Sequence, residues 1–349
     1  MIEVKNLCVD LGEFVLKDVT LNIEEGEYFI ILGPTGAGKT VLLESIAGLY
    51  PIKSGEIWLR GKEVTRVEPE KRRISIVYQD YVLFPHLSVK DNIVFGLRMN
   101  NATTKELEDR LNWAAKLLGI SNLLHRRPDT LSGGEKQKVA LARAIAIQPE
   151  LLLVDEPLSA LDPETRESVQ QELRQLHRAL GITILHVTHD FEEAIALGNR
   201  IAVIGEGRLM QVGTPEEIFR HPNSEFVARF AMTRNIFHGQ AEKRPNGDTV
   251  FTIDGAEFVI AGDSEGSYHA SIRPEDILIS SEPVRSSARN CLPGIITRIT
   301  DKGSTLYITV SIPPDLSCLV TRHSFEEMGL VEGKKVFLTF KASSIHLFD

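Results

Sequence analysis

The stretch EYFIILGPTGAGKT, residues 27–40, decides the fold of the N-terminal part of the chain. It begins as a continuous apolar run of strand length and ends in a loop that fits the pattern G-x-x-x-x-G-K-S/T. Glycines in such a loop let backbone N–H groups turn inward without a Cβ in the way, and these groups form a nest for anionic oxygens. We therefore predict a nucleotide bound by the residues of this loop, which are Gly33, Pro34, Thr35, Gly36, Ala37, Gly38, Lys39 and Thr40.

Similar apolar runs recur along the first two thirds of the chain. They are LLLVDEP, TILHVTH and RIAVIGEG, at residues 151–157, 183–189 and 200–207. Helical patterns such as residues 167–181, which end on a glycine suited to a helix C-cap, lie between them. Strands that are apolar throughout are buried on both faces, as in a parallel sheet covered by helices. The pattern predicts an α/β P-loop domain over residues 1–233 with a mostly parallel sheet.

The character of the sequence changes after residue 233, where short alternating strands separated by Gly, Pro, Asn and Asp predict a small all-β domain. Two blocks of residues 234–349 also repeat in the same order. NIFHG returns as NCLPG at residues 290–294, and YHASIRPEDILI returns as VFLTFKASSIHL at residues 336–347. We predict an OB-like or barrel domain built by internal duplication, its second half at about residues 286–349. The alternative is that the two blocks match only because short β-strands have similar sequences, without a duplication.

Composition and charge exclude several classes of protein. The chain has 349 residues, 25% of them charged, and a net charge of −9, which argues against a nucleic-acid partner. No apolar run approaches the ~20 residues that span a bilayer. Three distant cysteines, Cys8, Cys291 and Cys318, provide neither a disulfide framework nor metal-ligand spacing. The first residues lack the basic and apolar segments of a signal peptide, so we expect a cytoplasmic protein.

Polar residues end several of the predicted strands, at the edge where α/β sheets bind ligands. Asp155 and Glu156 follow one apolar run, and with Thr40 they suit Mg²⁺ binding and activation of a water for phosphoryl transfer. His189 closes another run, where it can reach a γ-phosphate, and Gln79 follows ISIVY. Taken alone, each is as readily a solvated strand end or a structural histidine. The phosphate loop favours the functional interpretation.

A second candidate anion site is LSGGEKQ, residues 131–137, where a serine and two glycines open a helix. With this motif the chain resembles the ATPase subunit of ATP-binding-cassette (ABC) transporters. The motifs resemble those of that family in order along residues 1 to about 230: Walker A in GPTGAGKT, the Q-loop at Gln79, the signature in LSGGEKQ, Walker B in LLLVDEP, the D-loop in SALD at residues 159–162, and the switch histidine at His189.

The resemblance implies a role for each matched residue, with ATP and Mg²⁺ as cofactors. Glu156, His189 and Gln79 would be catalytic, and Mg²⁺ would be held by Thr40, Gln79 and Asp155. In this family the signature motif completes the site of a second subunit, so a homodimer is implied. The residues implied to contact ATP in trans are Ser132, Gly133, Gly134 and Asp162.

The same resemblance implies roles for two further regions. The segment at about residues 84–145 would be the helical subdomain, which docks on the transmembrane permease subunits. Family members commonly stack an aromatic ring on adenine ahead of the first core strand. Leu11 lies where that ring often sits and Phe14 lies three residues on, so Phe14 is the candidate, with core packing as the alternative.

The C-terminal domain contains the sequence features that indicate which solute is transported. RPED, residues 273–276, resembles regulatory domains of importers of sugars, polyamines and oxyanions, and SARNCLPG and FKASS resemble the molybdate-binding small domain. We expect a molybdate or tungstate importer at the cytoplasmic face of the membrane, served by an extracytoplasmic oxyanion-binding protein and inhibited by cytoplasmic oxyanion. Sulfate, polyamine or sugar import, a non-transport ABC-type ATPase and an oxyanion sensor are the alternatives. The expected oxyanion-binding residues are Ser287, Arg289, Lys341 and Ser343.

Overall fold

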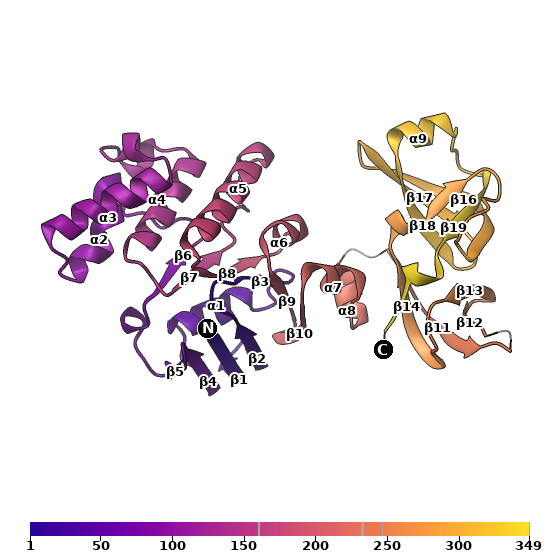
Figure 1. Ribbon diagram of the computed structural model, residues 1–349, viewed down its shortest axis with the longest axis horizontal. Coiled ribbons are helices and arrows are strands. Elements are labelled where there is room, and N and C mark those ends of the chain that lie inside the picture. The colour runs from indigo at the N-terminus through magenta and orange to yellow at the C-terminus, as the bar shows by residue number, and fades with distance from the viewer. Residues whose placement is uncertain (160, 232–233, 246, 349) are drawn as a thin grey trace. The chain divides into compact units, whose positions relative to one another are not determined.

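The computed structural model describes residues 1–159, 161–231, 234–245 and 247–348 (Figure 1). The chain divides into two compact units, Met1–Pro215 and Glu216–Asp349. The sequence prediction ended the first domain at residue 233, which lies outside the described residues. The division instead assigns helix α8 (Glu225–Phe230) and nearly all of α7 (Pro215–Arg220) to the second unit.

The first unit is built on a six-stranded sheet of order β10-β9-β3-β8-β7-β6. Its strands are β3 (Tyr28–Leu32), β6 (Ile74–Val77), β7 (Leu151–Asp155), β8 (Thr183–Thr188), β9 (Arg200–Gly205) and β10 (Arg208–Gly213). All neighbouring pairs are parallel except β9 and β10. Every residue of β3, β7 and β8 is buried, which explains their continuous apolar sequences. The predicted α/β fold with a mostly parallel sheet is confirmed.

A second, antiparallel sheet of order β2-β1-β4-β5 was not predicted. Its strands are β1 (Ile2–Asp10), β2 (Val15–Ile23), β4 (Ser54–Leu59) and β5 (Lys62–Glu63). Helix α1 (Lys39–Ala47) lies between the two sheets (Figure 1), and one hydrophobic core includes Leu16 of β2, Leu42 of α1 and Leu153 of β7. This core holds the helix that follows the phosphate loop on both of its sides.

Helices cover the rest of the first unit. They are α2 (Val89–Met99), α3 (Thr104–Leu117), α4 (Gly133–Ala146), α5 (Pro163–Leu180) and α6 (Phe191–Leu197), with short 3-10 turns at Pro69–Lys71, Ser121–Leu123 and Pro128–Thr130. Helices α2, α3 and α4 pack as a group (Figure 1). Helices α3 and α4 begin with capping boxes, in which Thr103 pairs with Glu106 and Ser132 with Glu135. Within the described residues, none of the helices combines the length and the apolar character that crossing a bilayer requires.

The second unit contains two five-stranded antiparallel sheets around one core. One sheet comprises β11 (Asn235–Lys243), β12 (Thr249–Ile253), β13 (Ala256–Ile260), β14 (Gly266–Ile272) and β20 (Ile345–Phe348). The other comprises β15 (Leu278–Ser280), β16 (Asn290–Asp301), β17 (Thr305–Ser311), β18 (Asp315–Thr321) and β19 (Lys335–Phe340). Helix α9 (Arg322–Glu327) and the 3-10 turns Pro274–Asp276 and Ala342–Ser344 connect strands. The all-β, OB-like character predicted for this part of the chain is confirmed.

The two sheets of the second unit have equivalent strand orders, with one strand exchanged between them. Strand β20 pairs with β14 in the first sheet, and β15 pairs with β19 in the second. Two buried asparagines open equivalent strands and also cross over. The amide of Asn235 bonds the backbone of Ser317 in β18, and that of Asn290 bonds the backbone of Val259 in β13. Each half therefore completes one of its sheets, and the hydrogen bonding of its buried asparagine, with a strand of the other half.

Candidate active site

The phosphate loop connects β3 to α1 and has a backbone that requires glycine. Gly36 and Gly38 have φ of 81° and 98°, in the region that L side chains rarely adopt. A Cβ on Gly33 would lie 2.3 Å from the carbonyl oxygen of Ile204, and one on Gly38 would lie 2.3 Å from the ring of Phe14. The loop therefore packs too closely for side chains at two of its glycines.

The Lys39 ammonium is enclosed by this loop. The side chain is 5% exposed, and its Nζ donates hydrogen bonds to the carbonyl oxygens of Gly33 at 2.9 Å and Pro34 at 3.1 Å. Nζ also lies 3.4 Å from Oε1 of Glu156. A buried cation needs such partners, because desolvating an unpaired charge is costly. The arrangement concentrates positive charge within the loop, where the phosphates of a nucleotide would be bound.

Thr40 and Asp155 present hard oxygen ligands side by side. The Thr40 hydroxyl donates to Asp155 Oδ1 and Oδ2, at 3.2 and 3.1 Å. Asp155 is 7% exposed, and its burial raises the pKa of the carboxyl, as do the charges of Glu156 and Glu44, whereas Thr40 and Lys39 lower it. Oxygen donors of this kind fit Mg²⁺, which keeps several waters and takes few protein ligands. A divalent cation here would also offset the accumulated negative charge.

Glu156 lies between a cation and a histidine. Its φ of 43° is in the left-handed region, and its N–H donates to the Val187 carbonyl of the neighbouring strand at 2.9 Å. The Nδ1–H of His189 donates to Glu156 Oε2 at 3.0 Å. Because β7 and β8 are parallel neighbours, their carboxyl ends deliver both side chains to the same edge. Strained backbone of this kind persists where surrounding structure holds it, often at active sites.

A pocket of about 340 Å³ opens beside the phosphate loop. Its lining residues are Phe14, Thr35, Gly36, Gly38, Lys39, Thr40, Val41 and Glu156. The Phe14 ring covers Gly38 and also packs against the core, whereas Leu11 is exposed. Both interpretations of Phe14 from the sequence, adenine contact and core packing, are therefore compatible with its position.

Gln79 lies in the exposed turn that follows β6. Gln79 is not one of the described residues that line the pocket beside the phosphate loop. Its roles in catalysis and Mg²⁺ binding stay predictions.

The signature motif forms the N-terminus of α4. The Ser132 hydroxyl accepts a hydrogen bond from the Glu135 N–H at 3.3 Å, and the Glu135 carboxylate accepts one from the Ser132 N–H at 2.8 Å. The backbone hydrogen bond from Ser132 is the main cause of the lowered pKa of Glu135. Ser132 and Gly133 are exposed and Gly134 is half-buried. None of the three lines the phosphate-loop pocket of the described chain.

The D-loop lies against this helix start. A Cβ on Gly133 would lie 3.5 Å from Leu161, and one on Gly134 would lie 3.3 Å from Thr165. Asp162 caps α5, its carboxylate accepting the Thr165 N–H at 3.0 Å. Ala160 of the predicted D-loop lies outside the described residues. The four residues predicted to act in trans therefore gather around the neighbouring starts of α4 and α5.

Glu44 contributes to the site and was not predicted. It lies one helical turn after Thr40 on α1, where residues four apart share a face. The Tyr78 hydroxyl donates to Glu44 Oε1 at 3.1 Å, and burial is the main cause that raises the Tyr78 pKa to about 12. The i, i+4 spacing from Thr40 is the sequence signal that would have indicated it.

The candidate oxyanion residues lie in the second unit. Strands β16 and β19 pair with Asn290 opposite Phe340, which places Arg289 and Lys341 at the same end of the pair. Arg289 makes a bidentate ion pair with Asp248, its Nη1 and Nη2 lying 2.6 and 2.7 Å from the two carboxylate oxygens. The remaining candidates, Ser287, Lys341 and Ser343, are exposed. The structure brings the two cations to one edge but pairs Arg289 with a carboxylate.

Comparison with known proteins relates the chain to one family. The family model for ABC transporters matches residues 16–159, and the TOBE domain model matches residues 286–347. A molybdate/tungstate import ATP-binding protein of Pyrococcus abyssi (strain GE5 / Orsay) is 44% identical over 349 residues, which is the whole of both chains. One of Thermococcus kodakarensis is 48% identical over 82% of this chain and 86% of the relative. A spermidine/putrescine import ATP-binding protein of Bacteroides thetaiotaomicron is 40% identical over 99% of this chain and 73% of the relative.

Solved structures show the same relation for the first unit. A dimeric ATP-binding cassette in a post-hydrolysis state, bound to ADP and Pi, is similar with a TM-score of 0.55 and 32% sequence identity. The alignment covers 62% of this chain and 99% of that one. A component of a transporter complex from Clostridium perfringens has a TM-score of 0.59 and 31% identity, covering 65% and 92% of the two chains.

Proposed function

The chain belongs to the ATP-binding subunits of ABC transporters, and we propose that it hydrolyses ATP to power the import of molybdate or tungstate through a separate membrane permease. The observation that carries this choice of solute is the likeness, over the whole chain, to a protein named for molybdate/tungstate import. Relatives named for spermidine and putrescine are 40% identical, so a polyamine is the runner-up.

Uptake into proteoliposomes tests the choice of solute. The chain is assembled with its permease and an extracytoplasmic binding protein, and ATP is supplied on the cytoplasmic side. We expect ATP-dependent uptake of labelled molybdate or tungstate. Labelled sulfate, spermidine and a sugar are tested in parallel as the alternative solutes. Uptake of spermidine without uptake of either oxyanion would contradict the proposal.

In the proposed reaction the phosphate loop binds the β- and γ-phosphates, with Lys39 as their main cation. Mg²⁺, held by Thr40, Asp155 and Gln79, would neutralise charge that develops on the phosphate oxygens. Glu156 takes a proton from a water as the water oxygen bonds to the γ-phosphorus. The bond from that phosphorus to the bridging oxygen breaks, and ADP and phosphate leave. His189 holds the Glu156 carboxylate, which it contacts at 3.0 Å.

The contact between Lys39 and Glu156 would make the availability of the Glu156 carboxylate depend on phosphate binding. The two groups lie 3.4 Å apart, so phosphates that recruit Lys39 compete with the carboxylate for the same ammonium. When the phosphates take Lys39, the Glu156 carboxylate loses this contact and keeps the one from His189. The carboxylate would therefore be released to contact a water only once the phosphates are bound.

We further propose that the signature motif completes the pocket of a second copy of the chain. Ser132 and Gly133 are exposed at a helix N-terminus, which offers N–H donors and partial positive charge to an anion. The dimeric, ADP-bound cassette that the first unit resembles supports this arrangement.

Mixing two inactive variants tests it. A chain with Lys39→Ala keeps its signature, and a chain with Ser132→Arg keeps its phosphate loop. If ATP is bound between two copies, their heterodimer contains one intact site, and ATPase activity returns on mixing. Continued inactivity of a heterodimer whose formation has been verified would contradict completion in trans.

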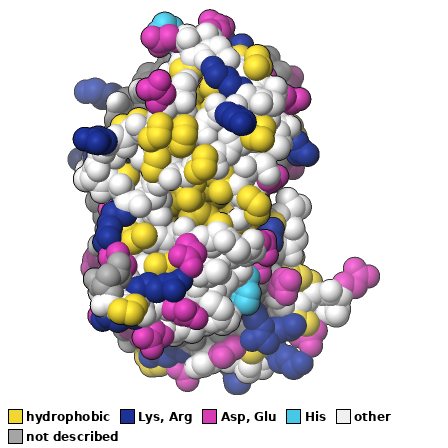
Figure 2. All heavy atoms as spheres, turned by 90° about the vertical axis from the view of Figure 1, so that its right-hand side faces the viewer, with side chains coloured by type: hydrophobic (Ala, Val, Ile, Leu, Met, Phe, Trp, Pro, Cys, Tyr) yellow, Lys and Arg dark blue, Asp and Glu magenta, His cyan; other side chains and the backbone are white. Residues whose placement is uncertain are grey.

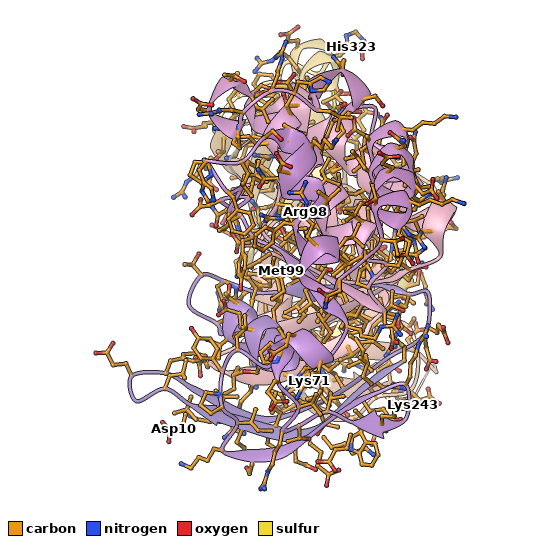
Figure 3. The ribbon with its side chains drawn as sticks, turned by 90° about the vertical axis from the view of Figure 1, so that its left-hand side faces the viewer. Asp10, Lys71, Arg98, Met99, Lys243 and His323 are labelled. Carbon is orange, nitrogen blue, oxygen red and sulfur yellow. The ribbon has the colours of Figure 1, made fainter. Side chains whose placement is uncertain are left out.

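The permease is proposed to dock on the helical part of the first unit. Met99, at the surface at the end of α2 (Figure 3), is a large apolar residue left 65% exposed, and Val82, just ahead of the helical part, is left 54% exposed. An ATPase docked there would work at the cytoplasmic face of the membrane.

The second unit is proposed to bind cytoplasmic oxyanion and inhibit the transporter. Figure 2 shows acidic and basic side chains interspersed on one face of the molecule, with hydrophobic side chains gathered in its middle. Such a surface has no general attraction for anions, so binding would depend on local donors such as Arg289, Lys341 and the hydroxyls of Ser287 and Ser343. Saturating molybdate and tungstate should lower the ATPase activity of the assembled transporter; unchanged activity with both would contradict inhibition.

A further inference from the structure

The segment between β6 and α2 follows Gln79 and has an unusual backbone. Tyr81 and Val82 are consecutive residues with positive φ, 60° and 40°. A β-branched residue such as valine pays a steric cost in the left-handed region, because its Cβ approaches the following carbonyl. Two consecutive non-glycine residues in this region persist only where neighbouring groups hold the backbone in place. The contacts of the segment identify those groups.

Arg143 of α4 holds the strained residues directly. Its Nη1 donates to the Val82 carbonyl at 2.9 Å and its Nη2 to the Tyr81 carbonyl at 3.1 Å. The guanidinium also lies over the Phe84 ring, 5.3 Å from the centroid. The planar fork of arginine matches two successive carbonyls in a way that a lysine ammonium cannot. Among the described residues, the side-chain hydrogen bonds and the ring contact of Arg143 all go to this one segment.

A second attachment joins the same helix to the chain ahead of Gln79. The Ser75 hydroxyl in β6 donates to the Ala144 carbonyl at 2.8 Å. Gln79 therefore lies between two attachments, at residues 75 and 81–82, to neighbouring residues of α4. The buried Asn92 of α2 then holds Phe84, accepting its N–H at 2.8 Å and donating to its carbonyl at 3.1 Å. The segment leaves Val82 exposed on the proposed docking surface.

We propose that Arg143 is a positioning residue, which holds Gln79 in register with the helix whose N-terminus carries the signature motif. This inference rests on the proposed function, in which Gln79 reaches Mg²⁺ and Ser132 reaches the ATP of a second subunit. Gly133 and Arg143 are ten residue steps apart, which corresponds to about 15 Å along the helix. A shift of that helix when a second subunit binds ATP is passed through the two Arg143 hydrogen bonds to Val82 and to Gln79.

A double-mutant cycle on the assembled transporter tests the inference. Arg143→Met keeps the apolar stem and removes both hydrogen bonds. We expect it to lower kcat about tenfold, within the range of coupling energies between sites. The KM for ATP should change by less than about twofold, because the phosphate loop is untouched. In a Gln79→Ala background, adding Arg143→Met should lower kcat no further, because the group it positions is gone.

Two controls separate positioning from general stability. Lys138 lies on the same helix but pairs with Glu172 of α5 at 2.7 Å, so Lys138→Met should leave kcat within about twofold. Arg143→Lys keeps the charge and can make one of the two bonds. It should show an intermediate loss, and it takes the place of Arg143→Met in the cycle if the methionine variant does not fold.

Two outcomes overturn the inference, and they differ. A loss from Arg143→Met that is undiminished in the Gln79→Ala protein means that Arg143 acts without Gln79, and it leaves the proposed function intact. A Gln79→Ala variant with wild-type turnover removes the proposed role of Gln79, on which the inference rests.

Discussion

The phosphate loop and the candidate oxyanion site hold their cations in opposite ways. In the loop, Lys39 is buried among carbonyl oxygens of its own segment and contacts Glu156 at 3.4 Å. In the second unit, Arg289 is half exposed and forms a bidentate pair with Asp248. A nucleotide entering the first site displaces one carboxylate contact and keeps the enclosing loop. An oxyanion entering the second must compete with a complete ion pair, so its affinity depends on how easily that pair opens.

The strongest test of the comparison is Glu156→Gln. Glutamine keeps the shape and cannot accept the proton of water, so kcat should fall by about 10²–10⁴. ATP binding should persist or tighten, because Lys39 loses its competing carboxylate. Labelled ATP binding and size-exclusion chromatography should show a nucleotide-bound dimer. Near-normal turnover would remove Glu156 as the base.

Lys39→Ala tests the enclosed cation itself. It removes the main charge on the phosphates and leaves Glu156 without its 3.4 Å partner. We expect kcat to fall by about 10²–10³ and most nucleotide affinity to be lost. ATP titration beside an Lys53→Ala control, which removes an exposed lysine paired with Asp10, shows whether the loss is specific. Equal ATP affinities in the two variants would contradict the assignment.

Asp248→Asn and Arg289→Gln test whether the ion pair of the second unit competes with oxyanion. Releasing Arg289 from Asp248 should tighten molybdate or tungstate binding by about tenfold, and removing Arg289 should weaken it by a similar factor. Calorimetric titration of the full chain measures both. If neither variant changes the affinity, Arg289 lies outside the site and the comparison between the two cations fails.

The smallest expected effect is on the free energy of unfolding, and it distinguishes Asp155 beside the phosphate loop from Asp248 of the second unit. Burial raises the Asp155 pKa above its ordinary 3.8, so the folded state binds this proton more tightly than the unfolded state. The stabilisation is complete below the ordinary pKa and is lost as pH rises through the raised pKa. At neutral pH, Asp155→Asn should therefore raise the free energy of unfolding by about 1 kcal/mol in nucleotide-free protein.

Asp248→Asn is the matched control for that measurement. It breaks an ion pair whose arginine is half exposed, so the free energy of unfolding should stay the same or fall by up to about 1 kcal/mol. Denaturant titrations at acid and neutral pH give both values. If Asp155→Asn destabilises the protein at neutral pH, the buried carboxylate is stabilised by more than its described contacts.

Much of the architecture was predictable, and the part that was not has a common cause. Strands β3, β7 and β8 were recognised because burial on both faces leaves an apolar sequence. The β2-β1-β4-β5 sheet and the exchange of β15 and β20 were missed. Alternating strands look alike whichever partner they pair with, because the pattern of one strand does not name its neighbour.

The sequence by itself determined the phosphate loop, since its glycines, lysine and threonine lie within eight consecutive residues and the backbone that places them is local. It also determined the family, through motifs that keep their order along the chain. Only the tertiary structure decided which partner each cation contacts: Lys39 contacts Glu156, Arg289 contacts Asp248, and Arg143 contacts the backbone carbonyls that follow Gln79. Such contacts depend on how distant segments pack, and a side chain's own sequence neighbourhood does not encode the partner that packing brings to it.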